Sequence, residues 1–317
     1  MTQIVIIDGK SLALPQSAWE RFHQFGSVKF YEATLPTEVV QRCSEANLII
    51  VNKVVFDRQT MDQLPKLQYI GVSATGYNNI DLAAAKGRGI VVTNVPSYAT
   101  RSVAQHAFAL LLEAVNHVGI HNAAVHEGEW ARAKDFYFAK KFPIDLEGLT
   151  FGVVGYGAIG QAAADLASAF GMKVIACTRN RLKRASVPLV DLETLLRTAD
   201  VVSLHCALTP ETKHLINASS LKLMKPTAIL LNTSRGPLID ESALATALKE
   251  KRIYAAALDV LEKEPPLPTC PLFELENCIV TPHLAWSSPG SRQKLLEQTI
   301  ENVDAFLNGN PINLIEV

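Results

Sequence analysis

Short apolar runs alternate with polar, helix-compatible stretches along almost the whole chain, and this alternation limits the possible folds more than any other feature. Many runs are rich in β-branched residues and end near Gly, Asn or Asp, as strands do. They lie at residues 4–7, 48–51, 69–72 and 90–93, and again at 150–154, 173–177, 201–205, 228–232, 254–259 and 278–280. Strands separated by helices form βαβ units, so we predict an α/β protein whose doubly wound parallel sheets are buried on both faces.

The 317 residues are enough for two domains, because a typical domain has about 150. Two long helices are expected, one over residues 100–118 and one that starts at Ser288-Pro289 and stops at Gly309. The short tail after Gly309 is expected to return to the first domain. The sequence therefore predicts a discontinuous domain of residues 1–99 and 288–317 and a second domain of residues 100–287, with a ligand in the cleft between them.

Three glycines follow the apolar run at 150–154, in the sequence Gly155-Tyr-Gly157-Ala-Ile-Gly160, and a helix-compatible stretch comes next. In a dinucleotide-binding turn the first glycine makes the bend, the second lets the pyrophosphate approach, and the third packs helix on strand. The helix N-terminus then offers amide groups to the phosphates. Such a motif also occurs in ordinary turns, but the strand and helix around it favour a Rossmann domain that binds a nicotinamide dinucleotide.

The end of the next predicted strand indicates which dinucleotide is bound. Thr178 stands where NAD-binding proteins usually have Asp or Glu, and Arg179, Arg181, Lys183 and Arg184 follow it. A carboxylate there binds the ribose 2′-hydroxyl and repels a 2′-phosphate, whereas an arginine accommodates the phosphate. A solvated basic loop is the alternative interpretation. We predict that NADP(H) is favoured and that NAD(H) is a possible cofactor.

Three polar residues follow strands of the second predicted domain. Arg235 lies in the sequence Asn232-Thr-Ser-Arg-Gly, Glu264 follows the strand that ends at Asp259, and His283 follows Thr281-Pro282. Groups at the carboxyl ends of parallel strands converge on the ligand cleft. Arginine, glutamate and histidine together can bind a carboxylate, orient an imidazole and transfer a proton. Each one alone also has an ordinary structural explanation, as a surface, loop or capping residue.

Composition argues against nucleic acid, membrane and metal as partners. Thirty basic and 31 acidic residues give a net charge of −1, which lacks the basic footprint of a nucleic-acid-binding protein. No stretch reaches the roughly 18 apolar residues of a membrane span. Five cysteines without a CxxC pair are typical of reduced thiols, so we expect a cytoplasmic protein with no membrane partner. His117 and His121 have metal-ligand spacing but no nearby carboxylate or cysteine set, so no metal site is predicted.

The glycine motif together with NTSRGPLID, ALDVLEKEPP and TPHLAW resembles the D-isomer-specific 2-hydroxyacid dehydrogenase family over essentially the whole chain. The Leu-Ala-Trp after His283 is similar to the glycerate dehydrogenase/hydroxypyruvate reductase branch. The resemblance implies a flavodoxin-like substrate domain, a Rossmann domain and a homodimer. It implies Arg235, Glu264 and His283 as the catalytic trio, with His283 donating a proton when a small 2-keto acid such as hydroxypyruvate or glyoxylate is reduced.

The resemblance also assigns binding residues. Its cofactor positions map onto Thr75, Ala158, Ile159, Thr178, Cys206, Thr233, Ser234, Arg235, Asp259, His283, Ala285 and Trp286, beside Gly155, Gly157, Gly160 and Arg179 from the motif and strand-end arguments. Its substrate-carboxylate loop maps onto Ala74, Thr75 and Gly76. Lys53, at another strand end, is a further candidate for the substrate. Two alternatives stay open, a 3-phosphoglycerate dehydrogenase and a nucleotide-sensing protein on the same fold.

Overall fold

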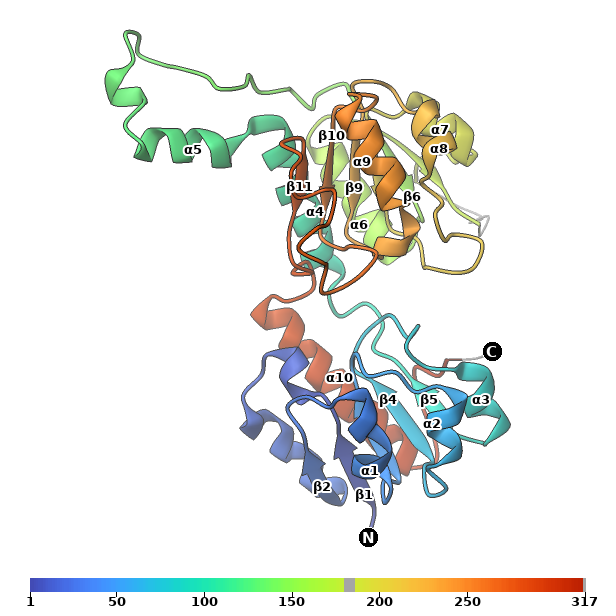
Figure 1. The fold of residues 1–317 in the computed structure, drawn as a ribbon. Coiled ribbons are helices and arrows are strands. Elements are labelled where there is room, and N and C mark those ends of the chain that lie inside the picture. The colour runs from blue at the N-terminus through green and yellow to red at the C-terminus, as the bar shows by residue number, and fades with distance from the viewer. Residues whose placement is uncertain (180–185, 316–317) are drawn as a thin grey trace. The chain divides into compact units, whose positions relative to one another are not determined.

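The computed structural model describes residues 1–179 and 186–315, which form two compact units (Figure 1). Unit 1 contains Met1–Ala99 with Ser287–Val317, and unit 2 contains Thr100–Trp286. The chain therefore leaves unit 1 before the first long helix and returns to it before the last. Arg181, Lys183 and Arg184 of the predicted basic loop lie outside the described residues.

Unit 1 is built on a five-stranded parallel sheet in the order β2-β1-β3-β4-β5. Its strands are β1 (Gln3–Ile6), β2 (Ser27–Phe30), β3 (Leu48–Val51), β4 (Tyr69–Val72) and β5 (Val91–Thr93). This is the flavodoxin-like strand order. β2 was not predicted from the sequence, because it is an edge strand of alternating exposed and half-buried residues rather than a continuous apolar run.

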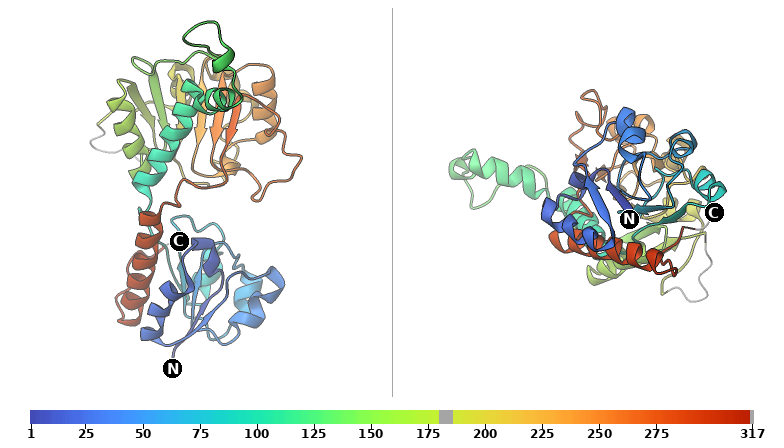
Figure 2. Two further views of the ribbon diagram at one scale, coloured as in Figure 1. Left: turned by 90° about the vertical axis from the view of Figure 1, so that its left-hand side faces the viewer. Right: turned by 90° about the horizontal axis from the view of Figure 1, so that it is seen from below.

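Helices cover the sheet of unit 1. They are α1 (Val39–Cys43), α2 (Arg58–Asp62), α3 (Leu82–Gly87) and α10 (Pro289–Leu307), with 3₁₀ turns η1 (Gly9–Leu12), η2 (Gln16–Phe25) and η3 (Pro36–Glu38). Helix α10, red in Figure 2, packs against β4 and η2. The predicted start of α10 is confirmed, since the Ser288 side chain accepts a hydrogen bond from the Ser291 amide and Pro289 is the first helical residue.

Unit 2 contains a six-stranded parallel sheet in the order β11-β10-β9-β8-β6-β7. Its strands are β6 (Thr150–Val154), β7 (Lys173–Cys177), β8 (Val201–Leu204), β9 (Ile229–Asn232), β10 (Ala255–Leu258) and β11 (Cys278–Val280). One parallel bridge between Ala176 and Leu189 extends the sheet beyond β7. The strand order thus reverses between β6 and β8, as in a Rossmann domain. The predicted fold class, two doubly wound parallel sheets, is confirmed.

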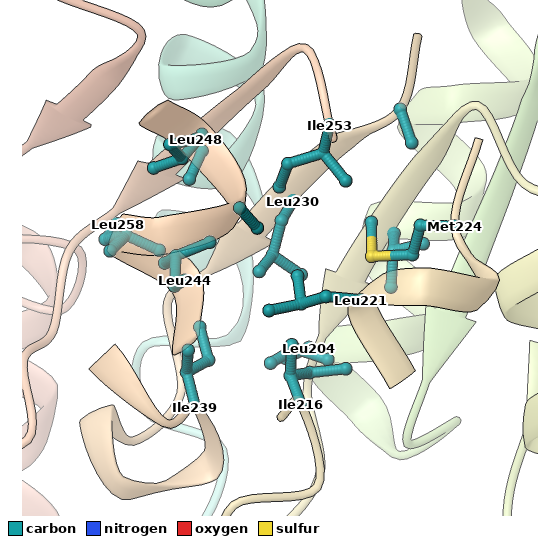
Figure 3. Packing of buried hydrophobic residues seen from close by; sticks show 14 of the residues in the cluster. Leu204, Ile216, Leu221, Met224, Leu230, Ile239, Leu244, Leu248, Ile253 and Leu258 are labelled. Atoms are coloured by element: carbon teal, nitrogen blue, oxygen red, sulfur yellow. The ribbon is translucent and has the colours of Figure 1, made fainter. Parts of the chain in front are cut away.

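The helices of unit 2 are α4 (Thr100–Asn116), α5 (Val118–His126), α6 (Ala158–Ala169), α7 (Leu192–Thr198), α8 (Ala218–Leu223) and α9 (Glu241–Lys249), with η4 (Trp130–Arg132) and η5 (Gly236–Leu238). Asp191 and Asp240 cap the N-termini of α7 and α9, since their carboxylates accept the amides of Thr194 and Ala243. Figure 3 shows the apolar core between α8, α9 and the sheet, with Leu221, Leu230 and Leu244 among its fully buried members.

The helix expected over residues 100–118 ends at Asn116 instead. His117 adopts a left-handed conformation with φ +54°, which histidine tolerates better than most residues, and α5 then starts in a new direction. The Glu113 carboxylate accepts the Gly119 amide at 3.0 Å across this break. α5 and the segment after it extend away from the sheet of unit 2 (Figure 1). Over residues 1–179 and 186–315, no helix combines the length and apolar character that a bilayer span requires.

Candidate active site

Three neighbouring strands of unit 2 bring the predicted trio to one edge of the sheet. Arg235 follows β9, Glu264 follows β10 and His283 follows β11, and the sheet places these strands side by side. Because the strands are parallel, all three loops leave from the carboxyl edge, where ligands of such sheets bind.

His283 and Glu264 form a direct pair. The Nδ1 atom of His283 lies 2.6 Å from Oε2 of Glu264, and both side chains are partly open to solvent. The other oxygen of Glu264 accepts the Leu261 amide at 3.1 Å, which fixes the carboxylate. A carboxylate only accepts hydrogen bonds, so Nδ1 carries the proton in this pair and Nε2 is left for proton transfer.

The loop that carries His283 is held by Asp259, the residue after β10. Its side chain is closed from solvent, and its carboxylate accepts the amides of Leu284 and Ala285, each at 2.8 Å, and the Thr281 hydroxyl at 2.6 Å. His283 itself has φ +56°, a conformation that is unfavourable for most L residues. The contacts of Asp259 therefore help to hold this loop in its left-handed turn.

Arg235 lies in a loop that packs against the loop of Glu264. The side-chain amide of Asn232 donates to the Arg235 carbonyl at 2.9 Å and accepts the Ser234 amide at 3.0 Å. These two hydrogen bonds stabilise the turn that carries Arg235. A Cβ atom on Gly236 would overlap with the carbonyl group of Leu261. Glycine thus allows the two backbones to touch, and this contact sets the spacing between the Arg235 and Glu264 loops.

The glycine turn between β6 and α6 has the geometry of a phosphate cradle. Gly155 has φ +96°, and a Cβ there would come within 2.5 Å of the Cys206 amide nitrogen; a Cβ on Gly160 would overlap with the Gly155 carbonyl oxygen. A Cβ on Gly157, however, would meet no described atom within 4 Å. The chain's own packing therefore explains two of the glycines, and a ligand approaching the N-terminus of α6 explains the third.

A second feature also fits a bound dinucleotide. The Thr233 hydroxyl, in the turn after β9, is buried and has no hydrogen-bond partner among the described residues. Buried hydroxyls are normally paired, so such an atom indicates a missing partner. The hydroxyl of neighbouring Ser234 donates instead to the Cys206 carbonyl at 2.7 Å, which ties the turn after β9 to that after β8. Together with Gly157, Thr233 fits a nicotinamide dinucleotide.

Two residues predicted to lie at the ribose come at the end of β7. Thr178 directly follows the strand and is half-buried, and Arg179 is exposed. Cys206, in the loop after β8, is another predicted cofactor residue, and burial raises the pKa of its thiol to about 11. This thiol is therefore not an activated nucleophile.

The predicted substrate residues belong to unit 1. Lys53 follows β3, and Ala74, Thr75 and Gly76 follow β4, the neighbouring strand. The Asn52 side chain joins the two loops by donating to the Ser73 carbonyl, and the Thr75 hydroxyl donates to the Val95 carbonyl at 2.9 Å. The two loops thus form one connected rim on unit 1.

The residues that hold these loops were not predicted from the sequence. The buried carboxylate of Asp8 accepts the amides of Asn52, Lys53 and Val54. Burial raises the pKa of this carboxyl, although the three amides favour its charged form. Asp8 follows the first apolar run, and its place at a strand end was the available signal. His106 contacts Thr281 and Asp259 from α4, but in the sequence it is one of several polar residues of that helix.

Comparison with known proteins gives a consistent result. The model of the NAD binding domain of the D-isomer specific 2-hydroxyacid dehydrogenases matches residues 108–285. A hydroxypyruvate reductase of Blautia hydrogenotrophica is 40% identical, and a glycerate dehydrogenase of Methylorubrum extorquens is 42% identical, each with 99% of both chains covered. A similar solved structure is an NADPH-dependent glyoxylate/hydroxypyruvate reductase from Sinorhizobium meliloti, in complex with NADP and malonate. It has a TM-score of 0.89 and 28% identity, and the match covers 99% of this chain and 96% of that one.

Proposed function

Because this chain belongs to the D-isomer specific 2-hydroxyacid dehydrogenase family, we propose that it reduces hydroxypyruvate, and glyoxylate or related small 2-keto acids, to the D-2-hydroxy acid with NAD(P)H. The observation that carries this proposal is the 2.6 Å pair of His283 and Glu264, at the sheet edge that Arg235 shares. A protein that only sensed a nucleotide would have no use for an oriented proton donor.

The chemistry of the side chains suits the reduction of a ketone beside a carboxylate. The nicotinamide, when bound, supplies a hydride to the keto carbon. The Arg235 guanidinium offers a planar pair of donors for the carboxylate and keto oxygens of the substrate. His283 gives the proton from Nε2 to the developing alkoxide, and Glu264 holds the ring through Nδ1 and favours the protonated imidazole. In the reverse direction the same imidazole accepts the hydroxyl proton.

The dinucleotide is proposed to bind along the carboxyl edge of the unit 2 sheet. Gly155, Gly157 and the amides of Ala158, Ile159 and Gly160 would hold the pyrophosphate, while Thr233, Ser234, Asp259, Ala285 and Trp286 would lie toward the nicotinamide. NADP(H) is the favoured form, since Thr178 replaces the acidic residue that repels a 2′-phosphate and Arg179 adds a positive charge.

Unit 1 is proposed to bind the substrate. Ala74, Thr75 and Gly76 would meet the substrate carboxylate, with Thr75 also near the cofactor, and Lys53 would add a positive charge. This division assigns residues 1–99 and 288–317 to the substrate domain and residues 100–287 to the dinucleotide-binding domain.

The enzyme is further proposed to be a cytoplasmic homodimer. All five cysteines are free, as in reducing compartments. The segment from α5 to residue 143 carries large exposed apolar side chains, including Trp130 (52% exposed), Phe136 (82%) and Phe142 (72%). Exposed apolar clusters of this kind mark protein interfaces. A monomer at micromolar concentration in sedimentation velocity would overturn the dimer.

The test of the proposed function is NADPH and NADH oxidation with a panel of hydroxypyruvate, glyoxylate, pyruvate, 3-phosphohydroxypyruvate and a bulkier keto acid. We expect the highest kcat/KM with hydroxypyruvate or glyoxylate. Preference for the phosphorylated acid would indicate a 3-phosphoglycerate dehydrogenase, and tight NADPH binding without turnover of any acid would indicate a nucleotide sensor.

A further inference from the structure

A histidine outside the trio takes part in the network that holds the His283 loop. His106, on α4, places its Nε2 atom 2.9 Å from the Thr281 hydroxyl and 3.3 Å from Oδ1 of Asp259. The same Thr281 hydroxyl lies 2.6 Å from that oxygen of Asp259. α4 packs against α6, β9 and β10, so the histidine is attached to a rigid part of unit 2.

The positions of the protons follow from the geometry. A threonine hydroxyl has a single hydrogen, and Thr281 uses it toward the Asp259 carboxylate. The hydroxyl oxygen can then only accept from His106, so Nε2 of His106 carries a hydrogen. Asp259 thereby accepts the Thr281 hydroxyl and the two amides after His283, and His106 is linked to this carboxylate through the Thr281 hydroxyl.

We propose that His106 is a positioning residue for proton transfer by His283, an inference that rests on the proposed function. The carboxylate of Asp259 is closed from solvent, and a buried carboxylate holds a loop only while its lone pairs are satisfied. His106 donates from a helix to the Thr281 hydroxyl oxygen, so the single hydroxyl hydrogen stays directed at the Asp259 carboxylate. Through Thr281 and Asp259 it keeps His283 in its left-handed conformation, with Nδ1 aimed at Glu264.

The variants separate this role from simple packing. His106→Leu keeps most of the volume and removes the donor, whereas His106→Gln retains an N–H group near the position of Nε2. Thr281→Val removes the intermediate hydroxyl without changing the size of the side chain. Gln105→Leu, at the exposed neighbouring position of α4, is the matched control.

For each variant kcat, the KM of hydroxypyruvate, the Kd of NADPH and the Tm are measured. We expect His106→Leu and Thr281→Val to lower kcat by about 10- to 100-fold, since a displacement of about 1 Å in a reacting group has effects of that size. The Kd of NADPH should change less than kcat, because most residues proposed to bind the cofactor, including the glycine turn and Thr178, lie outside the His283 loop. His106→Gln should recover most of kcat, and the double variant should lose little more than the worse single variant.

Three results would overturn the proposal: a kcat for His106→Leu equal to that of Gln105→Leu, equal losses in the Leu and Gln variants, or a loss confined to KM or Kd. If His106→Leu fails to fold, the kcat values of Thr281→Val and His106→Gln are compared instead. A kcat for Thr281→Val equal to that of Gln105→Leu, or equal losses in Thr281→Val and His106→Gln, would overturn the proposal.

Ring nitrogen NMR of the ¹⁵N-histidine-labelled full chain gives a readout independent of turnover. We expect His106 with a protonated Nε2 whose signal moves in Thr281→Val, and an unprotonated Nε2 would contradict the proposed network. A wild-type enzyme without activity on any keto acid would refute the proposed function, whereas an active enzyme insensitive to His106→Leu would refute this inference alone.

Discussion

At the scale of single residues, two side chains that touch each other have different tasks. In the proposed reaction His283 exchanges a proton with the substrate, while Glu264 contacts the imidazole and the Leu261 amide. Arg235 lies one strand further along the same sheet edge. Substitutions at these positions should therefore change different kinetic parameters, which allows each role to be tested separately.

Glu264→Gln should leave the KM of hydroxypyruvate nearly unchanged and lower kcat. The amide keeps a hydrogen bond to Nδ1 but has no negative charge beside the imidazole that gives up the proton. The measurement is kcat and KM for the reduction of hydroxypyruvate by the wild type and the variant. An unchanged kcat, or a loss confined to KM, would refute the pairing.

Thr178→Asp should shift cofactor preference from NADPH toward NADH. A carboxylate at the end of β7 accepts the ribose 2′-hydroxyl of NADH and repels the 2′-phosphate of NADPH. The ratio of kcat/KM values for the two cofactors checks this, with Thr178→Ser as a control that keeps the hydroxyl. If the wild type already prefers NADH by about tenfold, equivalent to about 1.4 kcal/mol, the interpretation of Thr178 and Arg179 is wrong.

At the scale of elements, the carboxyl ends of the strands are fixed by close backbone contacts rather than by large side chains. Gly155 meets the start of the loop after β8, and Gly236 meets the loop after β10. The Ser234 hydroxyl links the turns after β9 and β8, and Asn232 closes the turn of Arg235. Small residues at these crossings therefore determine how precisely the functional loops are spaced.

Two glycine substitutions should separate packing from ligand binding. Gly236→Ala makes a methyl group overlap with the Leu261 carbonyl. We therefore expect the free energy of unfolding to fall by about 1–3 kcal/mol and kcat to fall as well. Gly157→Ala puts its methyl group into open space, so we expect an unchanged Tm and a raised Kd of NADPH. The Tm from thermal unfolding and the Kd from titration with NADPH are measured for both variants. Unchanged NADPH binding by Gly157→Ala would remove the turn from the cofactor site.

At the scale of the whole molecule, the sequence predicted the parts that depend on local patterns. Apolar β-branched runs identified the six strands of unit 2, and Ser288-Pro289 identified the start of α10. Contacts between distant segments have no such local signal. The edge strand β2, the break at His117 and the link from His106 to Asp259 depend on tertiary structure, so they emerged only from the fold. The roles of the trio and the dimer stay predictions.

Stability should also depend on pH through one histidine of unit 2. The residue is closely surrounded by protein, and this desolvation lowers the pKa of His205 to about 4. In the unfolded chain the histidine pKa is ~6.5, so the unfolded chain binds the proton more readily than the folded one. The free energy of unfolding therefore falls as the pH drops from ~6.5 toward 4, by at most about 3 kcal/mol. His205→Asn should show a flatter dependence of Tm on pH over that range. Parallel curves for the two proteins would show that His205 makes no such contribution.

The most direct test of the proposed reaction is the turnover of hydroxypyruvate with NADPH by the wild type and by His283→Ala. We expect the wild-type enzyme to oxidise NADPH only when the keto acid is present. We expect kcat of the variant to fall by roughly 10²–10⁴, the usual contribution of a general acid, while NADPH still binds. A His283→Ala enzyme with the turnover of the wild type would refute the proposed role of His283, because the proton would then come from elsewhere.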